Sequence, residues 1–330
     1  MSQRHFSPQL SDHVRDLAQR WLGKHPKCKD WRIGNCYARQ AAKDCYILEA
    51  FNREMQPYWL YLGPWREWGR VGAEWSHLTW VCQTMSGLSP LFRLLGPILP
   101  PMDWTGLEEG FVGRAPRRQG KPFLDLVSQG KLGPETLVQL TGFLRLVQLR
   151  GKCQSRPLRS NDLVKLEKSA LGLATRGKHL IPDHLPYRRW QAFYLQNARS
   201  LATGNDLKLT WSIGKWVTQC FSIGDNGGLQ IKQPFFLCRE LAGMDLCRLL
   251  IKAGRASQQD RQYLIDFYYN RQVPSQFFTL LAHEHMTCLL KAFDKKQADQ
   301  LDREGALAAL ANFSRHHQGF RSPVPAWYLA

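Results

Sequence analysis

Apolar residues recur at the spacing of an α-helix through most of this sequence, and this periodicity limits the folds open to the chain. Near the N-terminus, Leu10, Val14, Leu17 and Trp21 fall on one helical face, after a Ser-Pro pair that suits the start of a helix. Because the same period returns along the chain, the sequence predicts a mainly α fold, a multi-helix globular protein.

Helix signals of the same kind mark several further segments. One covers about residues 35–55, with Tyr37, Ala41, Leu48 and Phe51 on its inner face. Others begin near residues 133, 160, 186, 257 and 273, each at a capping residue or a proline that favours a first helical turn.

One stretch departs from the helical period. Apolar and polar residues alternate from Leu207 to Ile213, Gly224 to Gly228 reads as a turn, and alternation resumes at Leu229. This pattern predicts one small β-hairpin within residues 207–233. Since an isolated hairpin is marginally stable, it is expected to pack on the helices.

A chain of 330 residues can form more than one domain. The composition suggests a Trp-rich helical region at 1–110, a basic helical region at 111–204, and the hairpin with C-terminal helices at 205–330, although all three could form one compact unit. No apolar run is long enough for a membrane helix, and the first residues do not resemble a secretory signal. The nine cysteines are odd in number and none lies in a Cys-x-x-Cys pair, which predicts reduced thiols and a cytoplasmic protein.

Net charge is the strongest signal of function. The chain has 45 Lys and Arg against 27 Asp and Glu, a formal net charge of +18. Such an excess favours a polyanionic partner, of which nucleic acid is the most frequent. An anionic membrane surface, an acidic protein partner, or a basic surface that serves solubility would give the same composition.

The basic residues cluster in a Gly- and Pro-containing loop at 113–121 and across residues 151–200, which carry ten basic and three acidic side chains. Clusters of this kind can follow a phosphate backbone without reading base sequence. The predicted nucleic-acid-binding residues are Arg114, Arg117, Arg118, Lys121, Lys152, Arg156, Arg159, Lys165, Arg176, Lys178, Arg188 and Arg189.

Five of the twelve tryptophans lie within residues 59–80. The second half of this window has a helical period, which predicts Trp75 and Trp80 to be core residues. The first half is rich in glycine, so a possible stacking surface for bases or a partner would consist of Trp65, Arg66, Trp68 and Arg70.

Catalytic and metal-binding motifs are scarce. There is no phosphate loop, no nucleophile elbow and no zinc-ligand spacing, so no metal and no cofactor are expected. His179 and His184 lie among arginines and lysines, and histidines in such surroundings can act as acid and base at a phosphodiester. The competing interpretation is a basic connecting loop.

These observations predict a nucleic-acid-binding subunit, for RNA or DNA, within a larger ribonucleoprotein or a mobile-element or defence complex. Other protein subunits are expected as partners, and binding without catalysis is favoured over an enzyme. Two alternatives stay open from the sequence: a metal-independent nuclease that uses His179 and His184, and a scaffold or adaptor that binds an acidic protein.

Overall fold

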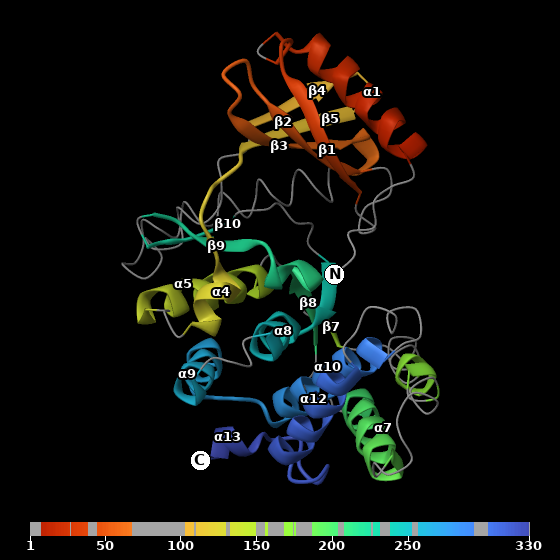
Figure 1. Cartoon of the computed structure of the whole chain (residues 1–330), viewed down its shortest axis with the longest axis vertical. Helices are drawn as coiled ribbons and strands as arrows, with labels where there is room; N and C mark the ends of the chain where they lie inside the picture. The colour runs from red at the N-terminus through yellow and green to blue at the C-terminus, as the bar shows by residue number, and fades with distance from the viewer. Residues whose placement is uncertain are drawn as a thin grey trace. The chain divides into compact units, whose positions relative to one another are not determined.

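The computed structural model describes most of the chain. The described residues are 8–26, 28–38, 45–67, 103–108, 110–129, 133–149, 156–157, 168–173, 175, 187–203, 208–225, 227–231, 238–252, 257–293 and 303–329. They form two compact units (Figure 1). Unit 1 comprises Met1–Leu126, Leu132–Phe143 and Gln219–Cys238, and unit 2 comprises Val127–Lys131, Leu144–Thr218 and Arg239–Ala330.

Unit 1 is built on a five-stranded antiparallel sheet. Its strands are β1 (Arg32–Ala38), β2 (Tyr46–Phe51), β3 (Pro57–Gly63), β4 (Asp103–Leu107) and β5 (Gly110–Pro116). Their spatial order is β1-β2-β3-β5-β4, so β3 is central and pairs with β2 on one side and β5 on the other. A short 3-10 helix, η1 (Trp65–Glu67), follows β3.

Helix α1 (Pro8–Lys24) covers one face of this sheet (Figure 1). Trp21 and Leu22 on the helix share a core with Leu48 on β2 and Leu60 on β3. The predicted N-terminal helix is therefore confirmed, and its apolar stripe explains why it forms: burial of such a stripe stabilises a helix more than intrinsic propensity does.

Unit 1 also contains a small sheet and the first parts of two helices, whose last residues belong to unit 2. Its strands are β6 (Lys121–Pro122), β9 (Phe221–Ile223) and β10 (Leu229–Ile231), in the order β10-β9-β6. The β9–β10 turn contains Gly227 at φ +77°, a left-handed conformation that favours glycine. Phe221 packs its ring edge-on against Phe123 of α4 (Phe123–Ser128) and Phe143 of α5 (Pro134–Leu149).

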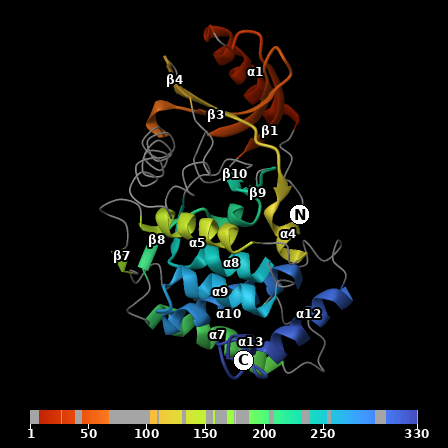
Figure 2. The same cartoon turned by 90° about the vertical axis from the view of Figure 1, so that its left-hand side faces the viewer.

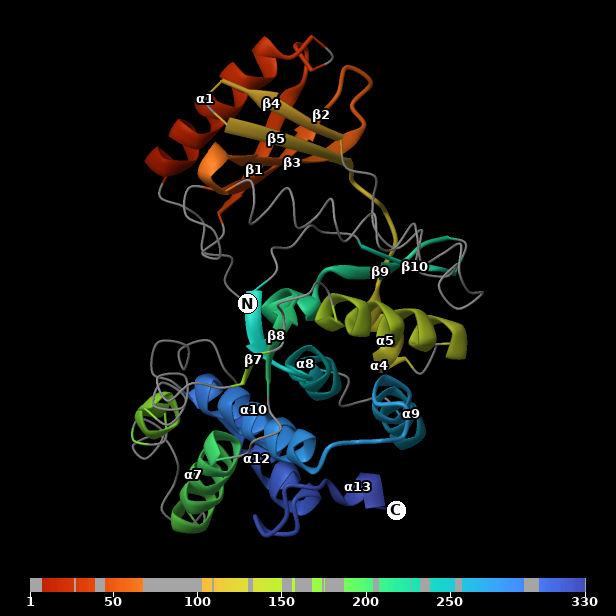
Figure 3. The same cartoon turned by 180° about the vertical axis from the view of Figure 1, so that it is seen from behind.

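Unit 2 is largely helical. Its helices are α7 (Tyr187–Thr203), α8 (Met244–Lys252), α9 (Gln258–Tyr268), α10 (Ser275–Phe293), α12 (Arg303–His316) and α13 (Ala326–Leu329). Helix α10 lies between α8 and α12 and also packs on α7 (Figure 3). Ala282, Met286 and Leu290 of α10 share a core with Phe193 of α7 and Phe313 of α12.

A second three-stranded sheet belongs mainly to unit 2. Strand β8 (Lys208–Ser212) lies between β7 (Arg156–Pro157) and β11 (Cys238–Leu241), and Figure 2 shows β7 beside β8. A 3-10 helix, η2 (Gly214–Thr218), follows β8 directly.

The predicted mainly α fold with one small hairpin was wrong. Three sheets are present in the described residues, and the helix expected over 35–55 is replaced by β1 and β2. In β2, four consecutive residues from Ile47 to Ala50 are buried, so both faces of the strand are covered. A strand of this kind lacks the alternation that reveals strands, and its apolar residues matched a helical spacing by coincidence.

The hairpin prediction was correct only in its second half. Residues 221–231 form the β9–β10 hairpin, whereas β8 pairs with β7 and β11 in a separate sheet. Arg156 of β7 lies opposite Leu209 of β8, so the partner of this strand comes from a distant part of the sequence. No helix in the described part of the chain combines the length and apolar character needed to cross a membrane.

Candidate ligand-binding loop

The turn that follows β8 has a defined backbone. Strand β8 ends at Ser212, Ile213 follows, and η2 begins at Gly214, whose φ is +70°. A side chain at this position would be strained, since non-glycine residues rarely adopt such an angle. Residues 212–218 are called the η2 loop below.

Asp245, in the first turn of α8, holds the backbone of the η2 loop. Its Oδ2 accepts a hydrogen bond from the Ile213 backbone N–H at 2.8 Å, and its Oδ1 accepts one from the Gly214 N–H at 3.0 Å. The Asp245 residue is only 7% exposed. A buried carboxylate that accepts two backbone donors fixes both peptide groups in place.

Ser212 connects Asp245 to a second carboxylate. Its hydroxyl oxygen lies 2.8 Å from Asp245 Oδ1 and 2.8 Å from Glu240 Oε2 on β11. The same oxygen accepts a hydrogen bond from the Gly214 N–H at 2.9 Å. The end of β8 and the start of η2 are therefore tied to both β11 and α8.

Arg248, one turn after Asp245 on α8, completes the network. Its two terminal nitrogens donate to both oxygens of Glu240, and its Nε donates to Glu284 Oε1 on α10 at 3.3 Å. Burial would lower the pKa of this guanidinium, but its hydrogen bonds and ion pairs with Glu240 and Glu284 raise it above its usual value. Arg248 therefore carries a fixed positive charge among three carboxyl groups.

The carboxyl groups respond to this environment. Burial, reinforced by the charge of Glu240, raises the pKa of Asp245 to about 6, although the hydrogen bonds from Ile213 and Ser212 act in the opposite direction. Burial also raises the pKa of Glu284, against the charges of Arg248 and Lys291. The η2 loop is thus supported by a buried ionic network rather than by apolar packing alone.

The sequence of the η2 loop contains few residues that could act as an acid or a base. Lys215 is the only charged residue from Ser212 through Phe221. Among the described residues, no group of three or more His, Cys, Asp or Glu side chains is arranged to hold a metal ion. The sequence of the loop therefore contains one cationic residue and no acidic residue.

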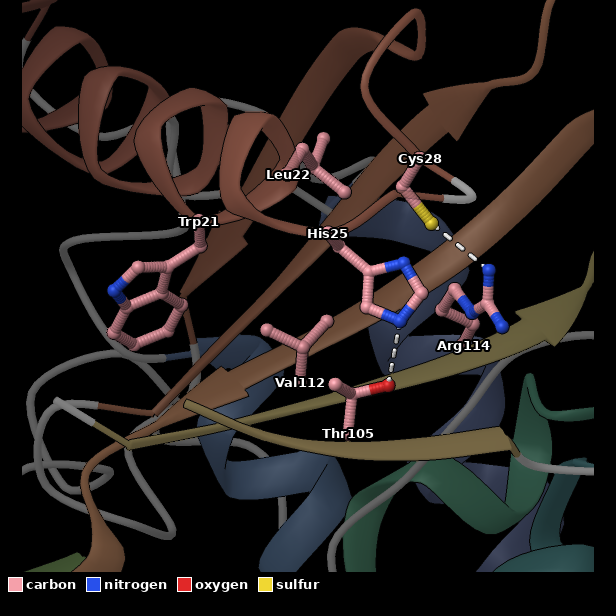
Figure 4. A pocket seen from close by; sticks show the side chains of 7 residues that line it. All are labelled: Trp21, Leu22, His25, Cys28, Thr105, Val112 and Arg114. Carbon is pink, nitrogen blue, oxygen red and sulfur yellow. Dashed lines mark hydrogen bonds between the residues drawn. The ribbon is translucent and has the colours of Figure 1, made fainter. Parts of the chain in front are cut away.

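A second candidate site is a small pocket in unit 1 (Figure 4). It lies between the C-terminal end of α1 and strands β4 and β5, and it is lined by Trp21, Leu22, His25, Cys28, Thr105, Val112 and Arg114.

The polar side chains of this pocket bond one another. His25 Nε2 lies 3.1 Å from Thr105 Oγ1, and Arg114 donates to Cys28 Sγ at 2.8 Å and forms an ion pair with Asp103. The geometry indicates a structural link between α1 and the sheet.

The predicted nucleic-acid-binding residues with described side chains lie in different surroundings. Arg114 is on β5 with its side chain largely buried, and Arg117 bonds buried Glu49 and stacks over the Trp59 ring at 5.2 Å. Arg118 is half-buried, and this burial lowers its pKa. Lys121 on β6 and Arg189 on α7 are exposed.

Other predicted residues fall where side chains are not described. Arg156 and Arg188 lie on β7 and α7, without a described side chain. Outside the described residues lie Lys152, Arg159, Lys165, Arg176, Lys178, the catalytic candidates His179 and His184, and the tryptophans Trp68, Trp75 and Trp80 together with Arg70.

The tryptophan window is divided by the structure. Trp59 is a buried residue of β3, while Trp65 and Arg66 lie on η1 and are exposed, Trp65 to 46%. One side of the Trp65 ring lies over Gly106 of β4, close enough that a Cβ there would collide with it. The stacking surface predicted at Trp65 and Arg66 remains a prediction.

Sequence reasoning missed the network around Asp245. A signal existed in Met244–Lys252, where Asp245 and Arg248 interrupt an apolar helix at a spacing of three residues. Charged residues are rarely fully buried unless paired, so such a pair within an apolar helix indicates internal partners. Ser212 and Glu240 gave no comparable signal.

Comparison with solved structures identifies the fold. A choline/ethanolamine kinase family protein from Mesorhizobium loti matches with a TM-score of 0.55 and 12% identity, over 96% of this chain and 99% of that one. An aminoglycoside phosphotransferase from Alicyclobacillus acidocaldarius matches with a TM-score of 0.50 and 10% identity, over 97% and 95%. No protein-family model and no curated protein matches the sequence.

The prediction of a nucleic-acid-binding subunit was wrong, and with it the nucleic-acid and protein-subunit partners. The chain has the fold of the choline/ethanolamine kinase family protein and the aminoglycoside phosphotransferase, whose names refer to small molecules. The physical reason for the error lies in the basic residues: Arg114 and Arg117, expected on an exposed loop, pair with Asp103 on β4 and Glu49 on β2. A net positive charge was read as a binding surface when part of it serves the fold.

Proposed function

We propose that this chain is a kinase-fold protein that binds a small phosphate-bearing molecule, such as a nucleotide, without transferring the phosphoryl group. The observation that carries the proposal is the η2 loop. Its backbone is held by Asp245, and its sequence contains a lysine, Lys215, and no acidic residue.

Phosphoryl transfer in kinases requires a small set of residues. A lysine on the third strand contacts the phosphates, and an aspartate in the catalytic loop accepts the proton of the substrate hydroxyl. An asparagine five residues after that aspartate and the aspartate of a Asp-Phe-Gly sequence hold Mg²⁺. These requirements can be tested against the sequence.

This chain lacks each of them. Strand β3 contains no lysine, and no Asp-Phe-Gly and no His-x-Asp sequence occurs. One aspartate is followed by an asparagine five residues later, Asp30 with Asn35, and the Asn35 amide donates to Glu49 within the sheet. No acidic residue lies between Asp225 and Glu240, the segment that follows the loop.

We align the η2 loop and the residues directly after it with the kinase catalytic loop, of which neither the aspartate nor the asparagine is present. Lys215 stands five residues before Cys220, where the motif has Asp and Asn. Lysine is a cation that cannot bind Mg²⁺, and Mg²⁺ prefers oxygen ligands to a thiol. Cys220 is also fully buried. The loop would therefore oppose phosphate charge with lysine instead of a metal ion.

The test is nucleotide binding with and without Mg²⁺. We expect calorimetry to detect ATP binding in EDTA, and we expect Lys215→Asp to abolish it by placing negative charge against the phosphates. Lys168→Asp, the same change at an exposed helical lysine, serves as the control. Binding that requires Mg²⁺, or is unaffected by Lys215→Asp, would contradict the proposal.

A second candidate function is a small-molecule phosphotransferase, which the likeness to the Mesorhizobium loti and Alicyclobacillus acidocaldarius structures favours. It predicts Mg²⁺-dependent conversion of ATP to ADP that is stimulated by an acceptor such as choline or an aminoglycoside. Turnover at the rate of a buffer blank, measured with these acceptors, would reject it. Either function would place the protein in the cytoplasm, where nucleotides are abundant, and cell fractionation would test this location.

A further inference from the structure

Ser212 makes two oxygen–oxygen contacts at hydrogen-bond distance, but its hydroxyl has only one hydrogen to donate. Its hydroxyl lies 2.8 Å from Asp245 Oδ1 and 2.8 Å from Glu240 Oε2, and it already accepts the Gly214 N–H. A hydroxyl has one hydrogen to donate, so it can satisfy only one of two ionised carboxylates. The other contact, at hydrogen-bond distance between two oxygens, needs a second hydrogen.

The surroundings show which carboxyl carries that hydrogen. Both Glu240 oxygens accept from Arg248, the arrangement of an ionised carboxylate in a bidentate pair. Asp245 lacks a direct contact with a cationic side chain among its described hydrogen bonds. The consistent assignment has Asp245 Oδ1–H donating to Ser212, and the Ser212 hydroxyl donating to Glu240.

We propose that Asp245, Ser212 and Glu240 hold one shared proton, and that loss of this proton loosens the η2 loop and so regulates ligand binding there by pH. The regulation of binding rests on the function proposed above. The sharing of the proton rests only on the geometry of the network.

The charges of the neighbouring groups favour a proton on Asp245. Arg248 on α8 is charged and forms an ion pair with Glu284 on α10, whose pKa burial raises, while Cys247 on α8 and Tyr268 on α9 stay neutral because burial raises the pKa of each. With all three carboxyls ionised, a single guanidinium would face three negative charges. The shared proton on Asp245 removes one of them, in an interior where repulsion is strong.

The direction of the response follows from Asp245. Because burial raises the pKa of this carboxyl to about 6, the network is complete in mildly acidic solution and loses its proton toward neutral pH. Once Asp245 is ionised, the Ser212 hydroxyl can bond only one carboxylate, and the other contact becomes repulsive. The backbone of Ile213 and Gly214 is then held less firmly.

Hydrogen exchange provides the direct test. After correction for intrinsic exchange rates, we expect the Ile213 and Gly214 amides of the full chain to be more protected at pH 5.5 than at pH 7.5. In Asp245→Asn the side-chain NH2 donates to Ser212 and cannot ionise, and the Gly214 N–H keeps only its bond to Ser212. Protection of Gly214 can fall overall but should be equal at both pH values. Equal protection of these amides in the wild-type protein would overturn the proposal.

Glu240→Gln gives an independent check if Asp245→Asn folds poorly. Removing the Glu240 charge lowers the pKa of Asp245, so the midpoint of the protection change should move to lower pH. An unchanged midpoint would count against a shared proton.

Metal-free ATP binding, measured at the same two pH values, should be tighter at pH 5.5 in the wild-type protein by more than in Asp245→Asn. If amide protection depends on pH but ATP binds at neither pH, the shared proton stands and the proposed function fails. If ATP binds but protection does not change, the shared proton fails and the proposed function stands.

Discussion

Two partly buried arginines, one in each unit, are neutralised in different ways. Arg114 in unit 1 pairs with Asp103, whose side chain is 59% exposed, and it also donates to the Cys28 thiol. Arg248 in unit 2 pairs with Glu240 and Glu284, whose side chains are 25% and 11% exposed. The first arginine balances an acid that water already solvates, and the second balances acids that the protein has removed from water.

The difference matters because an unpaired charge is costly only where water cannot reach it. Loss of Arg114 would leave Asp103 to be solvated at the surface. Loss of Arg248 would leave two acids, with Asp245 nearby, in a poorly solvated interior. The Arg248 network of unit 2 is therefore expected to contribute more to stability than the Arg114–Asp103 pair of unit 1.

The largest effect is expected for Arg248→Met. It preserves apolar volume but leaves Glu240 and Glu284 without their cation, and removing one partner of a buried ion pair costs about 3–5 kcal/mol. Denaturant unfolding followed by circular dichroism would measure the loss. A cost below that of Arg114→Met would break the contrast between the two arginines.

An intermediate effect is expected from the histidines of unit 2. Burial lowers the pKa of His283 to about 4, with the charge of Lys291 acting in the same direction, and its ring stacks on Tyr194 at 4.8 Å. Since the folded pKa lies below the usual 6.5, stability is present above pH 6.5 and is lost as pH falls toward 4.

The corresponding variant is His283→Phe, which keeps an aromatic ring and cannot be protonated. Relative to its value at pH 7.5, the stability of this variant at pH 5 should exceed that of the wild-type protein by about 2 kcal/mol. Thermal unfolding at both pH values would measure it. Parallel pH profiles for the two proteins would show that His283 titrates normally in the fold.

The opposite sign is expected for Asp245, whose pKa is raised. Its contribution is fully present below about pH 4 and is lost as pH rises through about 6. The stability difference between the wild-type protein and Asp245→Asn should therefore move toward the variant as pH rises from 4 to 7. Paired unfolding curves isolate this contribution from that of the histidines, which changes equally in both proteins.

The smallest effect is expected for Arg114→Met. Its partner Asp103 stays solvated, and the stacking of the guanidinium over Trp31 at 5.7 Å is a weak contact, so a loss of about 1 kcal/mol is expected. Urea unfolding monitored by tryptophan fluorescence would measure it. A loss as large as that of Arg248→Met would show that the Cys28 contact or the helix–sheet link matters more than charge.

Elements with one buried and one exposed face were predicted from the sequence, and elements buried on both faces were not. Helices α1 and α5 were found because each has a buried stripe and a proline at its start. Helix α9 was found from its cap, and Ser257 does accept the Asp260 N–H at 3.0 Å. Strands β2 and β3 were missed because covering both faces removes the alternation that marks a strand.

The candidate site was less accessible to sequence reasoning for a different reason. Ser212 and Asp245 are 33 residues apart, and Arg248 and Glu284 are 36 apart, so only the fold brings them together. In the sequence, Lys215 is one basic residue among many, and the role proposed for it depends on the turn in which it lies. The residues at 176–189 attracted attention through local charge, a signal that does not report tertiary partners.

The two hydrogen bonds that Asp245 accepts from the η2 loop bear on protein engineering. On the function proposed above, a designer who wished to install phosphotransfer would not need to build a rigid turn, since the peptide groups of Ile213 and Gly214 are already fixed. The work would lie in side chains: an aspartate at 215, a metal ligand near 220 and a lysine on β3. In this sense the loop backbone is already ordered, and only its side chains would have to change.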